Sequence, residues 1–67
     1  MNIEVIGNNA GLIWNALNEK NVMTLKELKK ATKLKEKETY ASLGWLAREG
    51  KINVEENEEK DLVITLL

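Results

Sequence analysis

The sequence predicts one α+β domain of 67 residues, with three helices, a C-terminal β-hairpin and a short extended segment at the N-terminus. Three observations indicate this class. A capped amphipathic segment follows Thr24, a longer helical segment ends at Gly50, and two strand-like stretches flank a polar turn near the C-terminus.

The N-terminal part is predicted to be extended before it becomes helical. Residues 1–6 alternate weakly between apolar and polar side chains, which is typical of a short strand. Residues 7–9, Gly-Asn-Asn, are a turn signal, and either asparagine could cap the helix that follows. From Ala10 to about Lys20 the spacing is helical, and the apolar side chains cover an arc of about 200°, which is wider than one core-facing stripe needs.

A second helix is predicted to begin after Thr24, because residues 21–23 break the helical pattern. Thr24 and Glu27 have the spacing of a capping box, in which each side chain accepts a hydrogen bond from a free backbone N–H. Leu25 and Leu28 supply an apolar pair on one face. The helix leads through a tight turn into the next helix.

The third helix is predicted from about Lys35 to Glu49, and Gly50 suits the left-handed position just past a helix end. Its predicted buried face consists of Thr39, Tyr40, Leu43, Leu46 and Ala47. Its predicted exposed face consists of Lys37, Glu38, Ala41, Ser42, Trp45 and Arg48. Strands are expected at residues 51–56 and 61–67, on either side of a turn at residues 57–60.

One spacing resembles the winged helix-turn-helix superfamily, namely that of Leu34, Leu43, Leu46, Gly50 and Ile52. The compact length and the segment YASLGWLAREGKI also resemble a small family of stand-alone bacterial winged-helix proteins of uncharacterised function. The resemblance covers nearly the whole chain. It implies that the third helix lies in the major groove of DNA and that the hairpin, the wing, touches the backbone or minor groove. Winged helices also serve as protein-docking modules, so the fold alone does not decide the function.

Charge is unevenly distributed, although the net charge is only −1. Residues 20–37 are rich in lysine. In a DNA-binding, transcription-regulator-like protein, the predicted nucleic-acid contacts are Lys26, Lys29, Lys30, Lys33, Lys35, Lys37 and Arg48. Of these, only Lys37 and Arg48 are placed to read base edges. Double-stranded DNA is therefore expected to be bound weakly, mainly through phosphates, and with a strong dependence on salt.

The predicted wing is acidic, where DNA-binding wings usually carry lysine or arginine. Its acids are Glu55, Glu56, Glu58, Glu59 and Asp61. A charge pair about 10 Å apart in water is worth roughly 0.4 kcal/mol, so these acids oppose DNA binding by about 1–2 kcal/mol before salt screening. The lysine cluster offsets this effect if it lies more than a Debye length away. The alternative function is a protein-interaction module that keeps the winged-helix scaffold without binding DNA.

A homodimer is predicted from the surplus of apolar residues on the first helix. The expected partner or dimer contacts are Leu12, Trp14, Ala16 and Trp45. Trp45 has two interpretations, either an exposed anchor for a partner or a side chain packed against the wing. The extended N-terminal segment or the last strand could also pair with the same element of a second chain.

The composition argues against several other classes of protein. The chain has no cysteine and no histidine, which excludes disulfides, thiolate metal sites and histidine-based triads. No glycine-rich phosphate loop or suitable carboxylate pair is present, so we expect neither an enzyme nor a bound cofactor or metal. The N-terminus lacks a signal sequence and no apolar run is long enough to span a membrane, so a cytoplasmic protein is expected.

Overall fold

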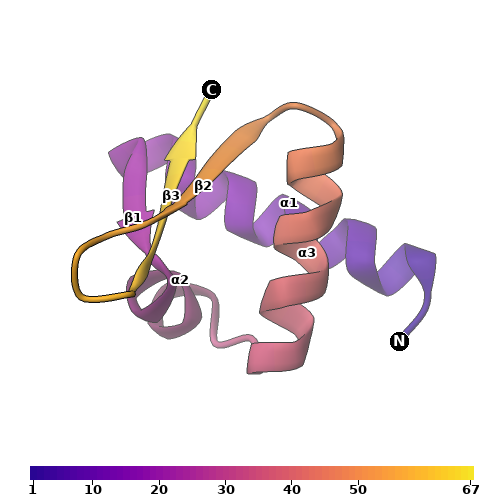
Figure 1. The fold of residues 1–67 in the computed structure, drawn as a ribbon. Helices are drawn as coiled ribbons and strands as arrows, with labels where there is room; N and C mark the ends of the chain where they lie inside the picture. The colour runs from indigo at the N-terminus through magenta and orange to yellow at the C-terminus, as the bar shows by residue number, and fades with distance from the viewer.

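Three helices and a three-stranded antiparallel sheet make up the computed structural model, which describes residues 1–67 (Figure 1). In chain order the elements are α1 (Ile3–Lys20), β1 (Val22–Thr24), α2 (Leu25–Thr32), α3 (Glu36–Arg48), β2 (Ile52–Glu56) and β3 (Leu62–Leu66). Figure 1 shows α3 crossing in front of α1, with the sheet beside the two helices. The predicted α+β class, with three helices and a C-terminal hairpin, is confirmed.

Helix α1 begins at Ile3, so the predicted extended segment over residues 1–6 and the predicted turn at residues 7–9 are both wrong. The helix is capped by Asn2, whose side-chain Oδ1 accepts a hydrogen bond from the Val5 backbone N–H at 2.9 Å. This bond satisfies one of the backbone donors that a helix start leaves free.

One face of α1 lies in the core of the domain. Its apolar stripe consists of Ile6, Ala10, Ile13 and Leu17, of which the last three are buried. The helical spacing of apolar residues therefore extends one turn toward the N-terminus from the predicted start at Ala10. The packing of this stripe outweighs the poor helix propensity of glycine and the β-branched residues. Asn21 ends the helix in a left-handed conformation with φ 68°, and its N–H donates to the Leu17 carbonyl.

The capping box of α2 is present as predicted. The Thr24 hydroxyl accepts a hydrogen bond from the Glu27 backbone N–H at 3.2 Å, and a Glu27 carboxylate oxygen accepts one from the Thr24 N–H at 2.9 Å. Leu28 is fully buried and anchors the helix to the core. Lys33 follows the helix with φ 60°, a left-handed conformation that allows the tight turn into α3.

Helix α3 is rotated about its axis relative to the prediction. Tyr40 is 47% exposed, so its predicted place in the core is wrong, and Ala47 is exposed as well. Ser42, predicted to be exposed, is fully buried together with Thr39. Both buried hydroxyls donate to the carbonyl four residues earlier, which in the case of Ser42 is the Glu38 carbonyl at 2.8 Å. Since these hydroxyls are satisfied within the helix, small polar residues can occupy its buried side.

The sheet has a third strand, β1, which was not predicted from the sequence and which pairs with β3 of the hairpin. The strand order is β1-β3-β2, and Ile64 in the central strand pairs with Met23 on one side and Val54 on the other. Both edges of β3 are therefore occupied, so its predicted pairing with a second chain is wrong. The N-terminal segment offers no strand edge either, because it is helical.

The core lies between the helices and one face of the sheet. Its buried apolar residues are Ala10, Ile13, Leu17, Met23, Leu28, Leu43, Leu46, Ile52 and Ile64. Gly50 links α3 to the sheet with φ 72°, as its predicted position past the helix end requires. None of the three helices combines the length and the apolar character that crossing a bilayer demands.

The capping box gives the domain a stability that depends on pH. The hydrogen bond from the Thr24 backbone N–H holds the pKa of Glu27 below its usual range. A carboxylate with a lowered folded-state pKa contributes stability above its unfolded value of about 4.3, and this contribution disappears as the pH falls through the folded pKa.

We expect Thr24→Ala to lower the free energy of unfolding by about 1 kcal/mol at pH 7, because the helix loses its cap. Glu27→Gln should remove part of the stability loss that the wild type shows below about pH 4.3. Urea denaturation followed by circular dichroism at pH 7 and pH 3 measures both effects, and Asn8→Ala on the exposed side of α1 is the control. Wild-type stability for Thr24→Ala, or an unaltered pH profile for Glu27→Gln, would contradict this account.

Candidate nucleic-acid interface

The solvent-facing side of α3 is a narrow strip with a cation near each end. Lys37 and Arg48 are eleven residues apart, which is close to three helical turns. They therefore lie on the same side, about 16 Å apart along the helix axis. Ala41 and Gly44 lie between them, and a Cβ added at Gly44 would meet no atom within 4 Å. We call these four residues the α3 strip.

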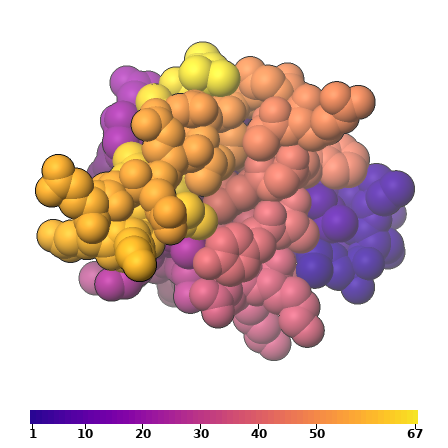
Figure 2. Space-filling view, viewed as in Figure 1, coloured from indigo at the N-terminus to yellow at the C-terminus, as the bar shows by residue number.

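The α3 strip occupies a prominent part of the molecular surface. In Figure 2, α3 runs down the middle of the visible face, with the hairpin on one side and the start of α1 on the other. On this face the third helix and the wing lie side by side, as the predicted fold implies. Nothing from the rest of the chain covers the strip at Gly44.

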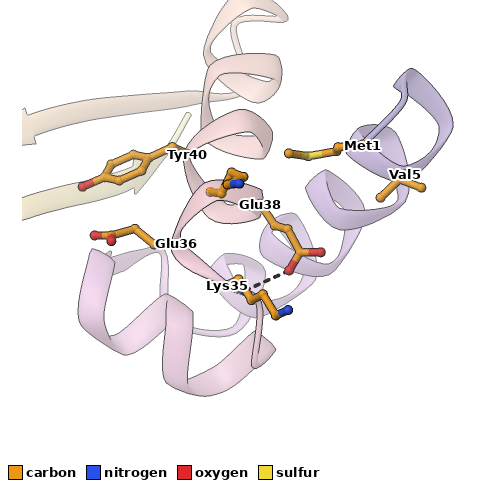
Figure 3. Close-up of a pocket in the computed structure, with 7 residues that line it drawn as sticks. Met1, Val5, Lys35, Glu36, Glu38 and Tyr40 are labelled. Carbon is orange, nitrogen blue, oxygen red and sulfur yellow. Dashed lines mark hydrogen bonds between the residues drawn. The ribbon is translucent and has the colours of Figure 1, made fainter.

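An open groove of about 710 Å³ lies beside the N-terminal end of α3 (Figure 3). Met1 and Val5 line it from the side of α1, whereas Glu36 and Tyr40 are directed the other way, toward the hairpin. Glu38 accepts a hydrogen bond from the Lys35 backbone N–H at 2.9 Å. This carboxylate therefore caps α3, although the sequence placed it simply on the exposed face.

Four of the predicted DNA contacts lie on α2 or directly after it. They form what we call the lysine face: Lys26, Lys29, Lys30 and Lys33. At 100° per residue the three lysines within α2 span roughly 100°, on the side away from the buried Leu28, and Lys33 is the residue that ends the helix. Lys29 is half-buried and the other three are exposed. The remaining predicted contacts, Lys35, Lys37 and Arg48, are exposed at the two ends of α3.

Two ion pairs join the lysine face to neighbouring elements. The Lys26 Nζ lies 4.0 Å from a carboxylate oxygen of Asp61, which closes the turn of the hairpin just before β3. The Lys29 Nζ lies 4.0 Å from a Glu36 carboxylate oxygen at the start of α3. A pocket of about 240 Å³, also lined by Tyr40, lies between these three elements. The lysine face is thus not separated from the wing by a Debye length of about 8–10 Å, since Asp61 contacts it directly.

The tip of the wing is a well-defined turn that carries free acids. The Asn57 side-chain oxygen accepts hydrogen bonds from the backbone N–H groups of Glu59 at 2.9 Å and Asp61 at 3.0 Å, which fixes the turn. Four acids of the wing make no ion pair, namely Glu55 and Glu56 at the end of β2 and Glu58 and Glu59 in the turn. All four are exposed, so the tip presents negative charge to solvent.

The predicted partner contacts are divided between two flanks of α1. Leu12 and Ala16 line a groove of about 310 Å³ on the side of α2. Trp14 and Trp45 line a second groove of about 370 Å³, on the side of α3. The Trp45 ring lies 3.9 Å from the position of a Cβ on Gly7, so this tryptophan packs on α1. Of its two interpretations, the structure therefore favours a packed, partly buried Trp45, and α1 is an element on which it packs.

The sequence-based prediction missed Gly44 and the two ion pairs of the lysine face. Gly44 lies seven residues after Lys37, which is about two helical turns. Its position on the strip could therefore have been predicted from this spacing. The pairing of Glu36 and Asp61 with α2 depends on how the elements pack. No local pattern in the sequence indicates it.

The fold and the surface described above define a winged helix-turn-helix protein. Residues 1–66 match the family described as winged helix-turn-helix domain (DUF2582), and the chain belongs to this family. The predicted resemblance to the winged-helix superfamily is thereby confirmed. A comparison with the curated proteins finds no match.

A solved structure of similar fold comes from Bacteroides thetaiotaomicron. It is the solution NMR structure of protein BT2368, which is 34% identical in sequence and superposes with a TM-score of 0.82. The match covers 97% of the present chain and 79% of that chain. The arrangement of three helices and a hairpin therefore recurs in a bacterial protein.

Proposed function

We propose that this winged helix-turn-helix protein binds double-stranded DNA, mainly through phosphates. The observation that carries the proposal is the α3 strip, in which small residues lie between the cations Lys37 and Arg48. The B-DNA major groove is about 12 Å wide and admits a helix. With about 16 Å between them along the axis, the two cations are spaced to reach phosphates on both sides of the groove.

The lysine face adds phosphate contacts beside the strip. Lysine is a mobile point charge and pairs well with phosphate oxygens, so these contacts increase affinity without reading sequence. Ala41 and Gly44 bring no hydrogen-bonding side chain to the base edges, and only Lys37 and Arg48 could do so. We therefore expect little sequence preference, with an affinity that falls steeply as salt rises.

This proposal agrees with the cytoplasmic location and the role in transcription regulation that were expected from the sequence. A weak, largely nonspecific DNA-binding protein of a bacterium works in the cytoplasm, and its effect on transcription would come from occupying DNA. The free acids at the wing tip favour the alternative, a protein-interaction module with a basic partner. We rank DNA binding first because the α3 strip is open and flanked by cations.

We expect a fluorescently labelled mixed-sequence duplex to bind the protein at low salt and to be released at physiological salt. In Lys29→Gln/Lys30→Gln/Lys33→Gln, the affinity should fall at least tenfold, because three phosphate contacts are lost. The slope of log K against log salt should become shallower by about 1.8–2.7, since Lys30 and Lys33 each contribute about 0.9 and Lys29, which is paired with Glu36, contributes up to about 0.9. Fluorescence anisotropy measures both quantities.

A matched control places the same change of net charge elsewhere. Asn8→Asp/Asn15→Asp/Asn18→Asp lowers the charge by three on the exposed surface of α1 and should leave the salt slope unchanged. An equal loss of affinity in both triple variants would contradict the proposed lysine contacts. No binding by the wild type even at low salt would contradict the DNA function and favour a protein partner.

We also propose that the protein forms a homodimer through the flank of α1 that carries Trp14 and Trp45. Trp14 is 37% exposed, and Gly11 beside it leaves open space in which a second chain can approach closely. Sedimentation at high micromolar concentration should give a dimer mass, and Trp14→Ala should shift the mass to the monomer. Leu12→Ala, on the opposite flank, is the control. A wild-type mass of one chain would contradict the dimer.

A further inference from the structure

We propose that Glu36 and Asp61 are internal phosphate mimics, which occupy Lys29 and Lys26 until a DNA phosphate takes their place. The inference rests on the proposed function, because it assumes that the lysine face binds phosphate. In addition, Lys26 and Lys29 exchange a carboxylate partner for a phosphate when DNA binds. The two carboxylates therefore compete with DNA for these lysines.

The geometry of the two ion pairs supports this role. Both carboxylate oxygens lie 4.0 Å from a lysine Nζ, and they approach α2 from two different elements. Glu36 comes from the start of α3 and Asp61 from the turn of the hairpin, directly before β3. Figure 3 shows Glu36 directed toward the hairpin side, away from Met1 and Val5. Both acids line the pocket of about 240 Å³ that also contains Lys26 and Lys29.

The pairs are weak enough to be exchanged. The Lys26 side chain is 85% exposed and the Glu36 side chain is 62% exposed, so water and salt screen both interactions. Exposed ion pairs contribute little, and a phosphate in a DNA track can compete with them. We therefore expect each carboxylate to lower the DNA affinity by only about two- to fivefold.

The other two residues of the lysine face differ from Lys26 and Lys29 in having no carboxylate partner. Lys30 and Lys33 have no ion-pair partner within 4.0 Å in the structure. These two lysines are available for the first encounter with DNA, whereas Lys26 and Lys29 contribute only after their carboxylates are displaced. The protein thus has a graded phosphate-binding surface.

A double-mutant cycle tests the exchange. Glu36→Gln should raise the affinity for the labelled duplex about two- to fivefold and steepen the salt slope by up to about 0.9, because Lys29 becomes free. In the Lys29→Gln background the same substitution should have no such effect. Asp61→Asn should behave in the same way with Lys26→Gln. The free acid Glu58 provides the control, since Glu58→Gln should act equally in both backgrounds.

A second readout separates this inference from the DNA function. The salt concentration that elutes each variant from phosphocellulose reports phosphate binding without DNA. If the wild type fails to bind the duplex, but Glu36→Gln elutes later only when Lys29 is present, the DNA function fails and the internal competition stands. If Glu36→Gln has the same effect with and without Lys29 in both assays, or no effect in either, the inference is overturned. Circular dichroism confirms that each variant is folded.

Discussion

The contact between α1 and α3 fixes the rotation of α3, and the position of every side chain of the α3 strip depends on it. Thr39 and Ser42 can face the core because their hydroxyls donate to carbonyls of the same helix, at 2.9 and 2.8 Å. A buried polar group satisfied in this way costs little and takes little room. With this side buried, the opposite side of α3 faces solvent, and it carries Lys37, Gly44 and Arg48.

The resulting surface combines attraction and repulsion for DNA. In the proposed complex, the lysine face and the two cations of the α3 strip attract phosphates, whereas the wing tip repels them and two carboxylates compete for lysines. Since the net charge is −1, long-range attraction is small and binding depends on the local arrangement of cations. This balance explains why a winged-helix protein with an open strip is expected to bind weakly and to respond strongly to salt.

Local signals in the sequence predicted the elements whose ends are set by neighbouring residues. The capping box of Thr24 and Glu27, the stop at Gly50 and the hairpin all follow from short-range chemistry. The N-terminal segment was misassigned because its β-branched residues and glycine disfavour a helix, whereas it continues the helix whose residues Ala10, Ile13 and Leu17 are buried in the core. The rotation of α3 was also missed, since apolar spacing alone assigns Tyr40 to the core in preference to the small hydroxyl residue Ser42.

The parts of the candidate site that could not be predicted depend on contacts between residues far apart in the sequence. The seven cations could be named from composition, but the approach of Asp61 to Lys26 joins positions 35 residues apart and exists only in the folded chain. The same holds for β1, whose three residues become a strand only because β3 lies beside them.

The most direct test is an NMR titration of the ¹⁵N-labelled protein with a short mixed-sequence duplex at low salt. We predict that the backbone amide signals shift along α2 and the α3 strip, at Lys30, Lys33, Lys37 and Arg48, and that these shifts disappear as salt is added. The signals of Trp14 and of the α1 flank around it should stay in place. Shifts confined to α1 or the wing tip, or no shifts at all, would contradict the interface described here.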